Sequence, residues 1–212
     1  MANVTPVPAA SVLLLRDAPL SVLMMRRHEK SSFVPNMWVF PGGAVEESDR
    51  AIANGSELDT MRLAAARETF EETGIWLGDE TRTFAASMTL DDLQREAPLD
   101  LERLTWTSHW ITPAGIPIRF DTWFFVTKLL DGAIAPVESA ESDAMLWIEP
   151  REALARHERG EFPLVFPTVK NLEAILDHNS ADGLIESRRG ATIVAVQPRI
   201  LVENGRKKIV LP

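Results

Sequence analysis

The chain has 212 residues, 45% of them hydrophobic and 25% charged, so it has ample apolar material for one folded domain. Its 22 basic and 31 acidic residues give a formal net charge of −9, which disfavours a general nucleic-acid binder because such proteins carry a basic surface. It contains no cysteine, which excludes disulfide bonds, cysteine-ligated zinc and a thiol nucleophile.

No apolar stretch reaches the ~18 residues that a membrane-spanning helix needs. Residues 1–6 lack the charged and apolar regions of a signal peptide. We therefore expect a cytoplasmic protein whose partners include neither membranes nor nucleic acids.

The first half of the chain alternates apolar runs with turn formers. Runs at residues 9–16 and 20–27, separated by residues 17–19, predict a pair of strands. A loop rich in turn formers then leads to residues 38–43, which read WVFPGG, and residues 57–73 predict a helix.

The predicted helix has Ser56 as its N-cap and Gly74 as its C-terminal stop. At about 100° per residue, three carboxylates fall within a sector of roughly 100° near its C-terminal end. These are Glu68, Glu71 and Glu72, and the residues expected to face the core on the opposite side are Leu63, Ala66 and Phe70.

The second half predicts several short elements and a terminal hairpin. Strands scattered among helices of unequal length favour a mixed α/β layered domain over a doubly wound parallel sheet. The expected elements are one or two short helices over 89–110 broken near Pro98, strands over 119–128 and 144–148, helices over 150–160 and 167–178, a strand around 191–196, and a hairpin at Asn204-Gly205.

The carboxylate cluster is costly for a bare helix end. Like charges three and four residues apart repel by some tenths of a kcal/mol per pair, and the helix dipole disfavours anions near the C-terminus. A divalent cation would reverse both penalties, and Mg²⁺ is typically held by one or two carboxylates plus substrate phosphates. A solvated acidic helix face has the same spacing, but the Gly42-Gly43 turn permits close approach of a ligand and favours a metal site.

These residues resemble the Nudix box, G-x5-E-x7-R-E-U-x-E-E-x-G-U, in which U is apolar. Gly43 matches the opening glycine, and Thr69 replaces the first apolar residue. Asp49 stands in place of the first glutamate and is separated from the arginine by residues 50–66 rather than by seven residues. We expect the extra residues, about 50–59, to loop out before the helix. The second half of the box is matched by Arg67, Glu68, Glu71, Glu72, Gly74 and Ile75.

The interrupted box is similar to that of the animal peroxisomal coenzyme A diphosphatases and their bacterial relatives. The resemblance implies an α+β fold, an α/β/α Nudix sandwich with a mixed β-sheet between helices. It implies one domain over residues 1–212, with an inserted helical segment at about 89–113 and a C-terminal helical and hairpin extension. Softer matches lie at Trp110-Ile-Thr-Pro113, Arg119-Phe-Asp-Thr122, Phe124-Phe125, Glu141 with Trp147, and Phe166-Pro-Thr168.

The resemblance also implies the chemistry. Mg²⁺ or Mn²⁺ would be bound by Glu68, Glu71 and Glu72, with Arg67 orienting these glutamates, and water would attack one phosphorus of a diphosphate. Glu141 is the candidate for a distal ligand or base, with Glu138 as runner-up.

The substrate implied is a small nucleotide-like diphosphate, with coenzyme A or acyl-coenzyme A as one candidate. The coenzyme A signature places an arginine and a glycine where this chain has Ser32 and Asn36, while Arg27 keeps the register of an upstream signature arginine. Arg26, Arg27 or Arg119 could compensate, although Arg119 could instead pair with Asp121. Phe33 or Trp38 could stack on a base. The candidate substrate-binding residues are Arg27, Phe33, Trp38, Gly42, Gly43 and Arg119.

Two other functions stay open. One is hydrolysis of ADP-ribose, dinucleotides or nucleotide sugars with the same metal helix. The other is a non-catalytic nucleotide sensor, which could dispense with the metal ligands that this chain retains. Isoprenoid diphosphate isomerases are excluded because they use a catalytic cysteine. Many relatives dimerise, so the resemblance leaves a homodimer open. The 89–113 segment forms either an active-site cap or a subunit contact, and both alternatives stay open.

Overall fold

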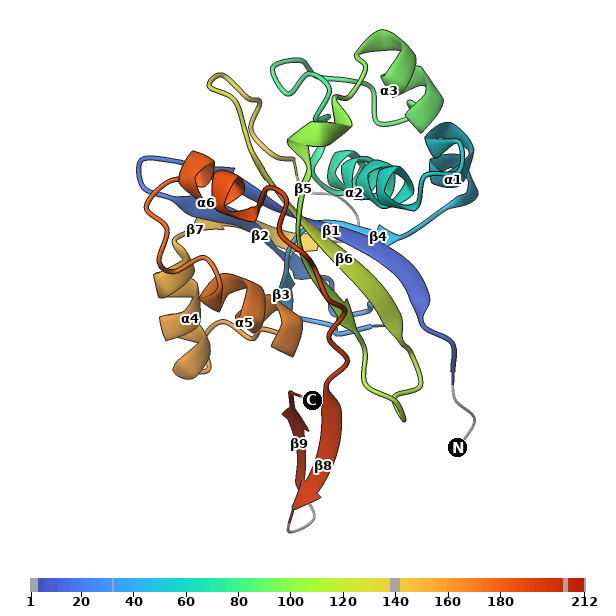
Figure 1. The fold of residues 1–212 in the computed structure, drawn as a ribbon. Helices are drawn as coiled ribbons and strands as arrows, with labels where there is room; N and C mark the ends of the chain where they lie inside the picture. Colours follow the sequence, from blue (N-terminus) through green and yellow to red (C-terminus); the bar gives the residue numbers. More distant parts are fainter. Residues whose placement is uncertain (1–3, 32, 138–141, 204–205, 212) are drawn as a thin grey trace.

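The computed structural model describes residues 4–31, 33–137, 142–203 and 206–211. A mixed sheet lies between two layers of helices (Figure 1). One layer holds α1 (Glu47–Ala53), α2 (Glu57–Thr73) and α3 (Leu90–Glu96), and the other holds α4 (Pro150–Glu158), α5 (Phe166–Glu173) and α6 (Ala181–Arg188). This arrangement confirms the predicted α/β/α fold.

The main path of the sheet runs in the order β3-β2-β1-β6-β5, while β4 pairs with β1 and β7 pairs with β2. Strands β1 and β6 are parallel, and the other pairings between two strands of this sheet are antiparallel. The strands are β1 (Val7–Arg16), β2 (Ser21–Arg27), β3 (Trp38–Val39), β4 (Gly42–Ala44), β5 (Thr105–Ile111), β6 (Phe120–Lys128) and β7 (Ser142–Ile148). A separate hairpin, β8 (Arg199–Glu203) with β9 (Arg206–Val210), follows the last helix.

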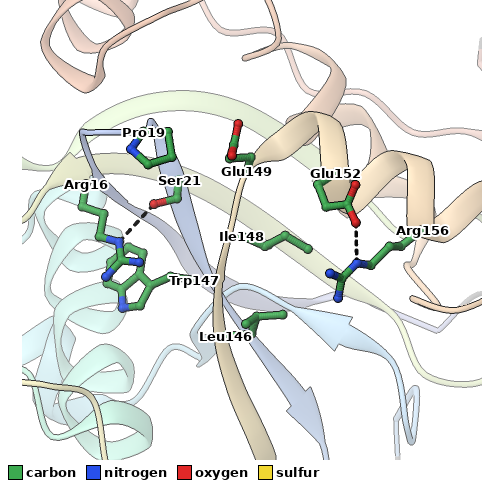
Figure 2. Close-up of a pocket in the computed structure, with 9 residues that line it drawn as sticks. All are labelled: Arg16, Pro19, Ser21, Leu146, Trp147, Ile148, Glu149, Glu152 and Arg156. Carbon is green, nitrogen blue, oxygen red and sulfur yellow. Dashed lines mark hydrogen bonds and ion pairs between the residues drawn. The ribbon is translucent and has the colours of Figure 1, made fainter.

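An open pocket of about 220 Å³ lies at the edge of the sheet where β7 leads into α4 (Figure 2). The Nε atom of Arg16 donates to the hydroxyl of Ser21 at 3.1 Å, and the same guanidinium lies 4.6 Å from the ring centroid of Trp147. On α4, Arg156 pairs with Glu152 at 2.7 Å. Three of the charged groups that line this pocket, Arg16, Glu152 and Arg156, therefore already have partners, and none of the three predicted metal ligands lines it.

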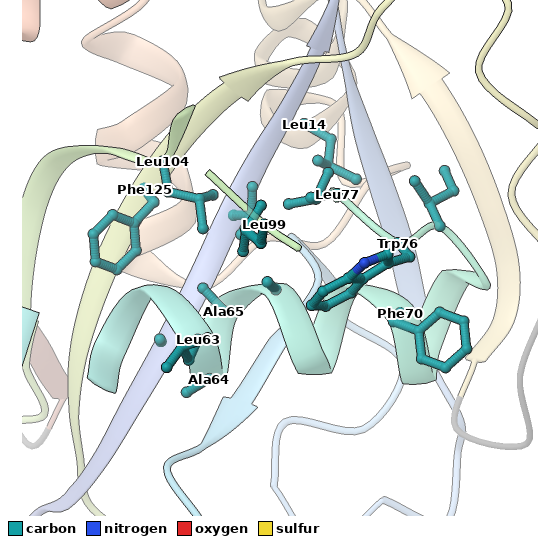
Figure 3. Packing of buried hydrophobic residues seen from close by; sticks show 14 of the residues in the cluster. Leu14, Leu63, Ala64, Ala65, Phe70, Trp76, Leu77, Leu99, Leu104 and Phe125 are labelled. Atoms are coloured by element: carbon teal, nitrogen blue, oxygen red, sulfur yellow. The ribbon is translucent and has the colours of Figure 1, made fainter. Parts of the chain in front are cut away.

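Strand β1 is buried on both faces because helices cover the sheet on each side. Val12 and Leu14 face the layer that contains α2, whereas Leu13 and Leu15 face the layer of α4, α5 and α6. This double burial explains the continuous apolar run in the sequence. Figure 3 shows the α2 side, where the helix packs with Leu63, Ala64, Ala65 and Phe70 against Leu14, Trp76, Leu77, Leu99, Leu104 and Phe125.

The helix predicted over 57–73 is confirmed with both of its ends. The hydroxyl of Ser56 accepts from the backbone N–H of Asp59 at 3.2 Å, and Gly74 adopts φ 74°, the left-handed conformation that glycine adopts without steric cost. The strands predicted over 9–16, 20–27, 119–128 and 144–148, the helices over 150–160 and 167–178, and the terminal hairpin are also confirmed, apart from shifts of a few residues at their ends.

Three sequence predictions are wrong. The segment over 89–113 was expected to be helical, and it does contain α3 and the short 3-10 helix η1 (Leu101–Arg103). Residues 105–111, however, form strand β5, which pairs with β6. Its aromatic and β-branched side chains favour this strand. The tail around 191–196 is not a strand; Val196 alone bridges to Trp110. The insertion expected to loop out over about 50–59 instead forms the end of α1, a short turn and the start of α2, and the C-cap of α1 is Asn54 with φ 49°.

A buried ion pair joins the turn after α2 to η1. Glu80, which is 1% exposed, accepts two hydrogen bonds from Arg103, at 2.7 and 3.0 Å, and one from the N–H of Leu130 at 3.0 Å. Burial alone would raise the pKa of Glu80, but these donors outweigh it and lower the pKa. Glu80 therefore stabilises the fold above pH ~4.5, and this stabilisation is lost as the pH falls below that value.

Replacing Glu80 by glutamine should lower the free energy of unfolding at pH 7 by about 1–3 kcal/mol, because Arg103 keeps a weaker, neutral partner. The difference from the wild type should shrink as the pH falls towards 3, because the wild type then loses the stabilisation that the charged carboxylate provides. Urea denaturation of both proteins at pH 7 and pH 3.5 measures it. The exposed Glu158→Gln serves as the control, and an equal loss at both pH values would contradict the assigned role of the charge.

Candidate active site

Arg67 is the centre of the carboxylate cluster on α2. It is 4% exposed and forms a bidentate pair with Asp49, in which Nε and Nη2 each donate to one carboxylate oxygen at 3.0 Å. Its Nη1 atom donates to Glu68 at 2.9 Å and to Glu71 at 3.1 Å, and Nη2 also donates to the carbonyl of Ala44 at 2.8 Å. All five N–H groups of the guanidinium are therefore used, and two of the three predicted metal ligands are held by one nitrogen.

The Gly42-Gly43 strand lies directly against these carboxylates. The backbone N–H of Gly42 donates to Oε2 of Glu72 at 2.8 Å. A Cβ atom at Gly43 would lie 2.5 Å from the carboxylate of Glu68, and one at Gly42 would lie 2.4 Å from the carbonyl oxygen of Ala10. The two glycines are thus needed because β4 fits between β1 and the glutamate face of α2.

The charges in this cluster are unbalanced. Burial raises the pKa of Glu71, and the carboxylates of Glu46 and Asp49 raise it further, against the lowering effect of Arg67. Burial would lower the pKa of Arg67, but its bonds to Asp49 and the surrounding carboxylates outweigh this and raise it. Three carboxylates, those of Asp49, Glu68 and Glu71, bond to one guanidinium, so the site has an excess of negative charge.

The donor set suits a hard divalent cation. The acidic side chains of the cluster offer carboxylate oxygens, and Mg²⁺ prefers oxygen ligands. Within the described part of the chain, no three acidic or histidine side chains already form a complete metal site. Because Mg²⁺ is commonly held by one or two carboxylates together with substrate phosphates, Glu68 and Glu71, which share one nitrogen of Arg67, fit a site that the substrate completes.

Three predicted substrate-binding residues lie away from this cluster. Trp38 packs with the core on the other side of the sheet and stacks on Phe162, with ring centroids 4.4 Å apart. Phe33 contacts Phe120 edge to face at 4.9 Å, and Nε of Arg27 donates to the carbonyl of Phe33 at 3.1 Å. The structure therefore brings Gly42 and Gly43 to the glutamates, while Arg27, Phe33 and Trp38 belong to the segment around the β2–β3 connection.

Arg119 is directed into the backbone rather than towards the glutamates. It is 4% exposed and donates to the carbonyls of Thr112 at 3.1 Å and Val4 at 2.7 Å. Asp121, the alternative partner considered for it, contacts the imidazole of His109. The position of Arg119 thus supports an anchor for the N-terminal segment rather than a contact with substrate.

The sequence analysis did not assign a role to Asp49, and the structure gives it one. It is fully buried on α1, where one of its oxygens also accepts from the N–H of Glu46 at 2.8 Å in a capping box. The spacing of Glu46 and Asp49, three residues apart before a helix, was the available signal. Glu138, Glu141 and Ser32 lie outside the described residues.

Comparison with known proteins points to one family. A profile described as the NUDIX domain matches residues 5–166. The chain is 30% identical over 177 residues to "Putative nudix hydrolase 7" of Caenorhabditis elegans, covering 77% of this chain and 58% of that protein. It is 27% identical over 203 residues to "Acyl-coenzyme A diphosphatase NUDT19" of Xenopus laevis, covering 63% and 53% respectively. The chain thus spans little more than half the length of these two relatives.

The solved structures agree with this result. The crystal structure of a NUDIX hydrolase from Alicyclobacillus acidocaldarius matches with a TM-score of 0.78 and 28% identity, covering 87% of this chain and 97% of that one. The profile match extends over both halves of the interrupted motif, from β1 to the start of α5. Together with the Arg67-centred cluster of glutamates, these matches show that the chain belongs to the Nudix hydrolase family.

Proposed function

We propose that this Nudix hydrolase cleaves the diphosphate bond of coenzyme A or acyl-coenzyme A, giving 3′,5′-ADP and the corresponding phosphopantetheine, with Mg²⁺ or Mn²⁺ as cofactor. The observation that carries the hydrolase part is the arrangement of Glu68 and Glu71 on one nitrogen of Arg67. The choice of substrate is supported by the similarity to relatives named acyl-coenzyme A diphosphatases.

The residues have distinct parts in this mechanism. Bound metal would polarise the phosphoryl oxygens and help to ionise the attacking water. Glu68, Glu71 and Glu72 would hold it, Arg67 keeps Glu68 and Glu71 in place, and the N–H of Gly42 fixes Glu72. Glu141 is proposed as the distal ligand or base.

The β2–β3 connection supports a nucleotide site despite its departures from the coenzyme A signature. Asn36 stands at the signature glycine with φ 61°, and asparagine is among the residues that tolerate this left-handed conformation. Its N–H donates to the carbonyl of Arg27 at 3.1 Å, so the turn is kept. Arg26 lies opposite Trp38 in the strand pair, and its buried Nε has no hydrogen-bond partner among the described residues. Residues directly opposite each other in a strand pair point to the same face of the sheet, so Arg26 shares the face of Trp38, away from α2.

A substrate panel tests the proposal. Coenzyme A, an acyl-coenzyme A, ADP-ribose, NADH, a nucleotide sugar and a diadenosine polyphosphate are each incubated with and without Mg²⁺ or Mn²⁺, and the products are identified. We expect metal-dependent formation of 3′,5′-ADP and phosphopantetheine. AMP from ADP-ribose or NADH would instead establish the alternative diphosphatase function. No turnover with either metal would favour a nucleotide sensor.

The two adjacent glycines should respond differently to alanine. In Gly43→Ala, the new Cβ displaces the flexible end of Glu68, so turnover should fall about 10–100-fold with little loss of stability. In Gly42→Ala, the Cβ meets the backbone of β1, so the free energy of unfolding should fall by about 1–3 kcal/mol. Steady-state kinetics and urea denaturation of both variants test this, and equal effects on stability would contradict the assigned geometry.

No helix of the described residues is long and apolar enough to cross a membrane. A small nucleotide-like substrate is consistent with the family, and a cytoplasmic location stays a prediction.

A further inference from the structure

The β8–β9 hairpin stands apart from the rest of the fold. It forms its own two-stranded sheet and projects away from both helical layers (Figure 1). Apolar side chains on it are open to solvent, since Leu201 is 43% exposed and Val202 is 66% exposed. An isolated two-stranded hairpin is marginally stable at best in water, and an unpaired strand edge is a template for another strand. These features indicate that the hairpin has a partner.

The sequence of β8 is complementary to itself. The strand reads Arg199-Ile200-Leu201-Val202-Glu203, with a cation at one end, an anion at the other and three apolar residues between them. If two copies pair antiparallel about Leu201, Arg199 of each copy lies opposite Glu203 of the other, and Ile200 lies opposite Val202. Opposite charges and β-branched residues placed directly across a strand pair both stabilise a sheet. Every residue of the strand thus finds a suitable partner in a second copy.

We propose that the chain forms a two-fold symmetric dimer by pairing the outer edges of β8, which gives a four-stranded sheet in the order β9-β8-β8-β9. Such an interface is isologous, because the same surface serves both subunits. Within each hairpin Ile200 lies opposite Ile209, on the same face as Val202. In the four-stranded sheet, Ile209 and Ile200 of one copy and Val202 of the other therefore lie side by side on one face, an apolar row wider than a two-stranded hairpin can provide.

The outer edge of β9 is unsuited to the same contact. Its sequence is Arg-Lys-Lys-Ile-Val, and pairing about its centre would set Lys208 against Lys208. Lysine on an edge strand opposes pairing with another chain. In the proposed order the two β9 strands are three strand spacings apart, roughly 14 Å, which exceeds the Debye length of ~8 Å at physiological ionic strength. The cationic strands therefore do not prevent the β8 contact.

Charge reversal on the full chain tests the pairing. In Glu203→Arg, arginines face each other at both ends of the interface, and in Arg199→Glu, glutamates do so. The wild type should have twice the chain mass of 23.6 kDa in light scattering at tens of micromolar, whereas each single variant should be monomeric. A one-to-one mixture of the two variants should recover the dimer, because Arg then faces Glu at every position, and the double swap should dimerise by itself.

Glu158→Arg makes the same change of charge at another exposed position and should leave the dimer intact. A monomeric wild type, dimeric single variants or a mixture that stays monomeric would each overturn the proposal. If the monomeric wild type sediments with anionic lipid vesicles, the basic hairpin binds a membrane surface instead. None of these measurements uses turnover, so their outcome is independent of the substrate.

Discussion

Replacing Glu71 by glutamine is expected to reduce metal-dependent turnover by on the order of 10²–10⁴-fold while leaving the fold intact. The variant keeps the size of the side chain but loses the negative charge that a divalent cation needs. Because burial and neighbouring carboxylates raise the pKa of Glu71, its ionised form costs stability at neutral pH, so the metal-free variant should be at least as stable as the wild type. Glu72→Gln should behave alike, since its amide oxygen can still accept from Gly42.

Two measurements separate the metal role from a general loss of function. Added Mg²⁺ should raise the melting temperature of the wild type, because a ligand of the folded state stabilises it, and should do so less in either variant. Glu57→Gln, an exposed change in the first turn of the same helix, should match the wild type in turnover and in its response to Mg²⁺. Full Mg²⁺-dependent activity in both variants would show that the site assignment is wrong.

Asp49→Asn should have the largest effect on stability. Removing one charge from a buried ion pair leaves the other without its partner and typically costs roughly 3–5 kcal/mol. We expect about 3 kcal/mol, the lower end of this range, because Glu68 and Glu71 still accept hydrogen bonds from Arg67. Turnover should also fall, by about 10–100-fold, since Arg67 positions the glutamates proposed to bind metal and loses its anchor on α1.

Urea denaturation at pH 7 gives the change in stability, and activity is measured under conditions where the variant is folded. The exposed Asp177→Asn is the matched control and should stay within about 0.5 kcal/mol of the wild type. If Asp49→Asn were as stable as this control, the buried pair would not hold α1 against α2.

The elements that the sequence predicted well carry their own local signals. Helix α2 has a serine N-cap, a glycine C-cap and carboxylates at helical spacing, and the structure shows all three features. The grouping of Glu68, Glu71 and Gly43 also followed from local features, because helical spacing and a glycine pair are properties of short segments. This part of the candidate site could therefore be predicted from local sequence features, without knowing how the strands pair.

The parts that failed depend on contacts between distant segments. Strand β5 and the polar residues before it read as a helix, yet the edge of β6 makes residues 105–111 extended. Arg119 resembled a ligand-binding arginine, but its partners, Thr112 and Val4, come from another loop and from the N-terminal segment. The role of Asp49 likewise required α1 to fold back on α2, across a gap of 18 residues in the sequence.

Helix α1 explains how the motif tolerates an interruption. The helix places the carboxylate of Asp49 next to the guanidinium of Arg67. The turn that joins α1 to α2 contains Gly55, where an added Cβ would meet no atom within 4 Å. Each doubling of a flexible loop costs only about 0.6 kcal/mol in closure entropy. This turn is therefore a natural place to insert an epitope or a fluorescent label, and it marks where chain length can vary in evolution without moving the glutamates.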